Sequence, residues 1–67
     1  MPHLTPASQA KCDLALSYIQ EMTAWYDEEM EGEPLTVYAL RILDQVDKRT
    51  PLTPDERAWL EAKINNE

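Results

Sequence analysis

The chain has 67 residues and a net charge of −7 from six basic and thirteen acidic residues, and a domain of this size buries only about 60% of the surface that its unfolded chain exposes. This charge balance excludes the basic footprint that nucleic acid or an anionic membrane surface requires for binding. One cysteine and one histidine exclude an internal disulfide and a structural zinc site, so added stability has to come from self-association or from a partner.

The N-terminal half of the chain predicts one long helix over residues 5–30. Thr5 is the expected N-cap, and Pro6 is the expected first helical residue, where the missing N–H of proline is no loss. At 100° per residue, one apolar stripe follows that we expect to face the core, formed by Cys12, Ala15, Ile19, Met22, Tyr26 and Met30, with Leu16 at its edge. We therefore interpret Cys12 as a core residue rather than as a reactive thiol.

A second apolar row lies beside this stripe and consists of Leu14, Tyr18 and Trp25; we call it the aromatic row. The two rows together cover about 200° of the helix circumference, so the helix needs neighbours on two sides. Two explanations of the aromatic row stay open. Either a later helix that carries Trp59 covers it, or it stays exposed as the centre of an interface with a second copy or with another protein.

A second, shorter helix is predicted over residues 34–49. Gly32 and Pro34 end the helical pattern before it. Its apolar side chains form one compact arc, made of Leu35, Tyr38, Ala39, Ile42, Leu43 and Val46. We expect this helix to run back antiparallel along the first one.

A third helix is predicted over residues 54–64, after a proline has ended the second helix. Thr53 and Glu56 form a capping box at its start. Residues 1–4 and 65–67 are expected to be loose. The fold class is therefore all-α, a single small domain that spans all 67 residues, with three helices and one dominant N-terminal helix.

Five of the thirteen acidic residues and no basic residue lie within residues 27–33. These five residues form the acidic run: Asp27, Glu28, Glu29, Glu31 and Glu33. At the end of the first predicted helix, each of the first three carboxylates faces the negative end of the helix dipole, at a cost of about 0.3–1 kcal/mol. Two interpretations stay open: a solvated turn that aids solubility, or a patch that docks on a basic surface of another protein.

Calcium binding is a remote alternative for this segment. Asp27, Glu29 and Glu31 alternate before Gly32, as at the opening of an EF-hand loop in a helix-loop-helix. The twelfth position of such a loop requires a bidentate glutamate, and this chain has Tyr38 there. The sequence therefore predicts no metal site, and nothing in it indicates another cofactor.

The residue sets used by enzymes are poorly represented. The only histidine, His3, lies in the terminal tail and Cys12 lies in the predicted core, so a nucleophile and a base cannot assemble. A small helical assembly also lacks the sheltered pocket that separates the pKa values of two carboxylates. We therefore expect a protein that is not an enzyme. The absence of an apolar stretch of membrane-spanning length, together with the free thiol, favours a cytoplasmic location.

These features together predict a protein-binding module. We expect its acidic run and aromatic row to engage a basic, nucleic-acid-handling protein and to inhibit that protein by covering its surface. In size and charge the chain resembles small phage-encoded inhibitors of host defence, such as anti-CRISPR proteins, and this analogy implies only a class of function. The alternative hypothesis is a structural or regulatory homodimer in which the first helix pairs with its symmetry mate.

Overall fold

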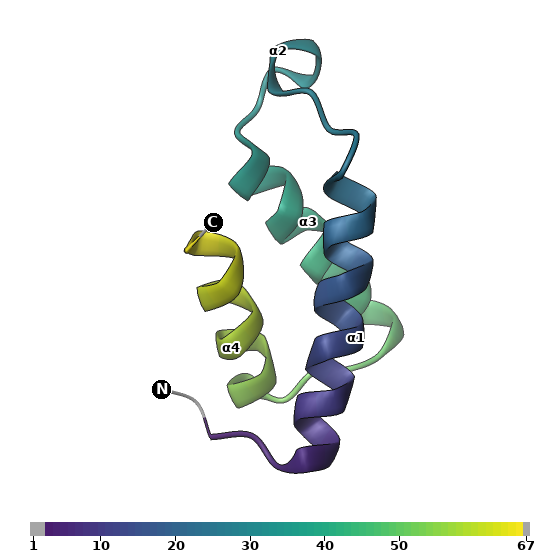
Figure 1. Cartoon of the computed structure of the whole chain (residues 1–67), viewed down its shortest axis with the longest axis vertical. Helices are drawn as coiled ribbons and strands as arrows, with labels where there is room; N and C mark the ends of the chain where they lie inside the picture. The colour runs from purple at the N-terminus through teal and green to yellow at the C-terminus, as the bar shows by residue number, and fades with distance from the viewer. Residues whose placement is uncertain (1–2, 67) are drawn as a thin grey trace.

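The computed structural model describes residues 3–66, and this part of the chain is all-α, as predicted (Figure 1). Within the described residues, four helices follow one another: α1 (Pro6–Thr23), α2 (Glu28–Glu31), α3 (Leu35–Arg49) and α4 (Pro54–Asn65). The three longer helices contact one another in pairs. The short helix α2 lies at one end of the molecule, in the connection between α1 and α3 (Figure 1).

Helix α1 begins as predicted. The side-chain Oγ1 of Thr5 accepts a hydrogen bond from the backbone N–H of Ser8 at 3.1 Å, and a proline occupies the first helical position. The helix ends at Thr23 and does not continue to Met30. The prediction of one continuous helix over residues 5–30 is therefore wrong.

The early end of α1 places two carboxylates of the acidic run at the favourable end of a helix dipole. In a continuous helix, the carboxylates of the acidic run would lie at its negative, C-terminal end. The chain instead turns at residues 24–25 and starts α2 at Glu28, so that Glu28 and Glu29 lie in a first turn, at the positive end of a new helix. Asp27 is the N-cap of α2, and its carboxylate accepts a hydrogen bond from the N–H of Glu29 at 3.0 Å. Gly32 ends α2 with a φ of 76°, the left-handed conformation that favours glycine.

Helices α3 and α4 agree with the predicted ranges to within one residue at each end. The predicted capping box of α4 is present. The hydroxyl of Thr53 accepts a hydrogen bond from the N–H of Glu56 at 3.2 Å, and the carboxylate of Glu56 accepts one from the N–H of Thr53 at 2.8 Å. Leu4, which was expected in a loose terminus, packs against the core. Residues 1–2 and 67 of the predicted loose ends lie outside the described residues.

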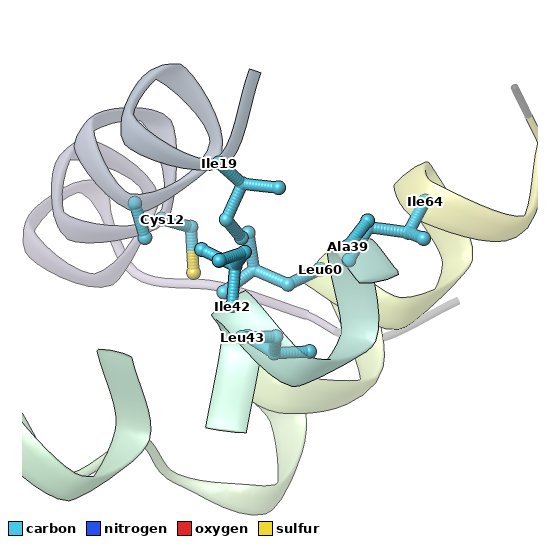
Figure 2. Close-up of a cluster of buried hydrophobic side chains, with 8 residues drawn as sticks. Cys12, Ile19, Ala39, Ile42, Leu43, Leu60 and Ile64 are labelled. Carbon is cyan, nitrogen blue, oxygen red and sulfur yellow. The ribbon is translucent and has the colours of Figure 1, made fainter. Parts of the chain in front are cut away.

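Buried apolar side chains from α1, α3 and α4 form the core (Figure 2), namely Cys12, Ala15, Ile19, Ala39, Ile42, Leu43, Leu60 and Ile64. The predicted core stripe of the first helix is confirmed at Cys12, Ala15 and Ile19. The prediction is wrong for Met22 and Met30, which are 43% and 81% exposed. Met22 is the second-last residue of α1, next to its end at Thr23, and Met30 lies beyond the end of α1.

Glu56 is the only charged side chain in the described part of the chain that is buried, with 3% of it exposed. Its carboxylate pairs with the ammonium of Lys11 at 3.1 Å, and Lys11 also donates to the carbonyl of Pro51 at 2.7 Å. Hydrogen bonds from the backbone N–H of Thr53, the hydroxyl of Ser8 and the ammonium of Lys11 lower the pKa of Glu56 to about 2. This buried carboxylate therefore joins the first helix to the start of the last one.

A second polar cluster joins α3 to α4. The guanidinium of Arg57 pairs with three carboxylates, those of Asp44, Asp47 and Glu61. Asp47 uses both of its carboxylate oxygens: Oδ2 pairs with Arg57, and Oδ1 accepts a hydrogen bond from the N–H of Leu52 at 2.8 Å. The bond from Leu52 and the bond from Arg57 lower the pKa of Asp47. Hydrogen bonds to these carboxylates raise the pKa of Arg57, and the bond to Asp44 has the largest effect. The cluster therefore fixes the turn between the two helices.

Replacing Leu43 by alanine should lower the free energy of unfolding by about 2–5 kcal/mol, because Leu43 is fully buried at the centre of the core. Urea denaturation followed by circular dichroism measures this change. Val37→Ala on the same helix is the matched control, since Val37 is 42% exposed, and we expect its effect to stay within about 0.5 kcal/mol. Equal losses in the two variants would contradict the burial of Leu43.

Acid should destabilise the fold through Glu56. Its pKa falls from an ordinary value of 4.5 to about 2 on folding, so its stabilisation is complete above pH 4.5 and is lost as the pH falls toward 2. The free energy of unfolding, measured in urea at a series of pH values, should decrease over this window. Glu56→Gln should be less stable than the wild type at neutral pH and should lose less stability in acid. The prediction fails if the two proteins have parallel pH profiles.

Candidate functional site

An apolar groove of about 520 Å³ runs along one side of α1. Side chains from α1, from the end of α3 and from the turn before α4 line it: Lys11, Leu14, Ala15, Tyr18, Val46, Arg49, Thr50 and Leu52. Two members of the aromatic row, Leu14 and Tyr18, are on its α1 side, and they are 74% and 40% exposed. The groove is therefore open to solvent, and its only charged lining residues are Lys11 and Arg49.

The aromatic row is exposed and lies on two elements. Leu14 and Tyr18 are on α1, whereas Trp25 lies in the turn after α1 and is 95% exposed. Trp59 does not cover the row, because it packs partly buried against the core, with its ring centroid 5.2 Å from the ammonium of Lys63. The explanation in which a later helix covers the aromatic row is therefore wrong. That the row serves as an interface stays a prediction.

Met22 extends the exposed apolar surface of α1. It follows Tyr18 by four residues, as Tyr18 follows Leu14, so the three side chains lie on one face of the helix. We call this surface the α1 stripe: Leu14, Tyr18 and Met22. From the sequence we predicted Met22 in the core. Its spacing of four residues from Tyr18 already indicated that it lies on the same face of the helix as Tyr18.

Three carboxylates of the acidic run stabilise the connection between α1 and α3. Glu28 accepts a hydrogen bond from the N–H of Leu35 at 2.8 Å and thereby caps α3, whose own N-cap residue is a proline without a side-chain acceptor. Glu33 pairs with Arg41 at 2.9 Å. Asp27 caps α2. These side chains therefore have structural roles that the spacing of the acidic run did not predict.

Tyr26 fixes the same connection against α3. Its ring stacks on that of Tyr38, with centroids 4.3 Å apart and 17° between the ring planes. Its hydroxyl donates a hydrogen bond to the backbone carbonyl of Glu33. Burial raises the pKa of Tyr26, and the neighbouring carboxylates, of which Glu33 has the largest effect, raise it further. The predicted place of Tyr26 in the core stripe of the first helix is wrong, because its partner is a ring on α3.

The other two carboxylates of the acidic run, on Glu29 and Glu31, make no hydrogen bond or ion pair with any described residue. Met30 lies between them and is 81% exposed, and Trp25 at the same end of the molecule is 95% exposed. We call these residues the tip: Trp25, Glu29, Met30 and Glu31. Figure 1 shows α2 protruding beyond the ends of α1 and α3.

The metal-ligating residue types and the single cysteine are the side chains that bear on metal binding and nucleophilic chemistry. No three His, Cys, Asp or Glu side chains among residues 3–66 are grouped so that they could hold a metal ion. Cys12 is fully buried, and this burial raises the pKa of its thiol, which makes it a poor nucleophile. None of the helices in the described range is both long and apolar enough to cross a membrane.

Glu28 and Glu29 are neighbours with different predicted contributions to stability. Glu28→Ala should lower the free energy of unfolding by about 1 kcal/mol, the typical effect of losing a capping hydrogen bond at a helix N-terminus. Glu29→Ala should change it by less than about 0.5 kcal/mol, because its carboxylate caps nothing. Thermal and urea denaturation of the two variants measure the difference. A larger loss in Glu29→Ala than in Glu28→Ala would be evidence against this division of the acidic run.

In comparisons with known proteins, no protein-family model, no curated protein and no solved structure matches this chain. A functional assignment therefore depends on the surfaces of the molecule. Two of them are candidates: the tip, and the α1 stripe with the adjoining groove.

Proposed function

We propose that this chain is a protein-binding module, not an enzyme, and that its tip docks on a basic surface of another protein. The observation that carries this proposal is the exposure of Trp25 and Met30, at 95% and 81%. Both lie at the end of the molecule that presents the outward carboxylates of Glu29 and Glu31. Large apolar side chains bordered by charge have the composition of an interface centre and its rim.

The negative charge of the chain favours a partner with a basic surface. The chain carries a net charge of −7, and the two outward carboxylates of the tip extend that negative potential at a protruding position. Such a field steers association with a cationic surface. Proteins that handle nucleic acid present basic surfaces, so they are the class of partner that the tip fits. Docking there covers the surface and inhibits the binding of nucleic acid.

Three contacts hold the connection around the tip against α3, which favours binding. Glu28 ties α2 to the start of α3, and the ring of Tyr26 stacks on Tyr38. The ion pair between Glu33 and Arg41 adds a third link to α3. A surface that is already ordered loses little conformational entropy when it binds. The contacts of Glu28 and Glu33 with α3 therefore hold in place the segment that carries Glu29 and Glu31.

Neutralising the two outward carboxylates should slow association with the partner. The partner is isolated by affinity capture from a lysate of the source organism, purified, and measured by surface plasmon resonance at several salt concentrations. We expect Glu29→Gln/Glu31→Gln to reduce the association rate roughly tenfold at low salt and to weaken its salt dependence. Glu28 stays unchanged in this variant, because it caps α3.

The matched control is Asp13→Asn/Asp55→Asn, which removes the same net charge from exposed positions on α1 and α4. This control should associate at a rate close to that of the wild type. Equal slowing of the two double variants would mean that only net charge attracts the partner, and it would refute docking through the tip. An unchanged rate in Glu29→Gln/Glu31→Gln would refute it as well.

A further inference from the structure

The α1 stripe and its groove form a surface that is separate from the tip. Leu14, Tyr18 and Met22 are 74%, 40% and 43% exposed, although a chain of this size has little apolar surface to spare. We propose that this surface pairs with the same surface of a second copy of the chain, with the two α1 helices antiparallel. The proposal does not depend on the partner of the tip.

The spacing of the α1 stripe makes it self-complementary. Tyr18 is the central residue, four positions from Leu14 and four from Met22. In an antiparallel pair with its twofold axis at Tyr18, Leu14 of each copy lies opposite Met22 of the other, and the two Tyr18 rings meet at the axis. Each apolar side chain therefore contacts an apolar or aromatic side chain of the second copy.

Charge selects the antiparallel direction over the parallel one. The groove end of this face carries Lys11 and Arg49, and the opposite end carries Glu21 and leads to the acidic tip. Antiparallel pairing brings the basic end of each copy toward the acidic end of the other, whereas parallel pairing would bring like charges together. Lys11 already pairs with Glu56. Arg49 has no carboxylate partner among residues 3–66, so it is free to pair across the interface.

A dimer of this kind needs a contact that extends beyond the three side chains of the α1 stripe. A standard interface buries about 800 Å² on each partner, which is about a sixth of the 4908 Å² surface of this chain. Helix α1 has 18 residues and is therefore about 27 Å long. The groove widens the contact beyond α1, because Val46 and Leu52 also line it. The α1 face and the groove beside it are the surface from which this contact area would come.

The paired arrangement leaves the tips accessible. Helix α2 lies beyond the end of α1 (Figure 1), so an antiparallel pair carries one tip at each of its two ends. The dimer then presents two copies of the surface to which we assign the docking function.

Sedimentation equilibrium of the purified full chain tests the pairing. The protomer has a mass of 7.8 kDa, and the wild type should sediment at twice this mass at high micromolar concentration. Leu14→Glu should raise the dissociation constant at least roughly tenfold, because it places a charge in the apolar contact. Met22→Glu should have the same effect from the other end of the stripe. Circular dichroism and thermal melting establish that both variants are folded.

Val37→Glu is the matched control, because Val37 is 42% exposed but lies on α3, outside the stripe and the groove. It should sediment as the wild type does. A monomeric wild type would overturn the proposal, and so would a dimer that persists in Leu14→Glu and Met22→Glu or that is lost in Val37→Glu. Added salt should weaken the dimer, since opposite charges face each other; strengthening by salt would overturn the antiparallel direction. Only the purified chain is used, so failure here leaves docking through the tip untouched.

Discussion

The structure depends most on one constraint: carboxylates are unfavourable at the C-terminal end of a helix and favourable at its N-terminal end. By ending α1 at Thr23 and starting α2 at Glu28, the chain places Glu28 and Glu29 at the favourable end of a helix. Two consequences follow from that break. Trp25 and Met30 lie outside the first helix and are exposed. The acidic run lies in the connection between α1 and α3, where Glu29 and Glu31 belong to the protruding tip.

Polar contacts supplement a small core. The buried carboxylate of Glu56 joins α1 to α4 through Lys11, and the guanidinium of Arg57 joins α4 to α3 through the carboxylates that surround it. At the other end of the molecule, Glu28 ties α2 to α3. The link at Glu56 satisfies a buried charge and the link at Glu28 satisfies a capping position, whereas the partly exposed cluster at Arg57 holds α3 against α4. The links leave the outer face of α1 without a partner among residues 3–66.

The two candidate surfaces differ in chemistry and position. The tip combines apolar side chains with negative charge at the end of the molecule, whereas the α1 stripe is apolar and lies along its side, next to the positive charge of Arg49. Under the two proposals, the chain would be a small adaptor that associates with itself through one surface and with a basic protein through the other. A pair of tips on one particle raises the apparent affinity for a partner that offers two basic sites, because the second contact forms at high effective concentration.

Local patterns were enough to predict the all-α class, the starts of α1 and α4 and the core side of α1, because caps and helical periodicity act within a few residues. Tertiary contacts decided the rest. Glu28 caps α3 and Tyr26 stacks on Tyr38 only because the chain reverses between them, and the burial of Glu56 depends on Lys11, far away in sequence. The exposure of the α1 stripe likewise depends on which sector of α1 the other helices cover. Such contacts join distant segments, so spacing along the chain does not reveal them.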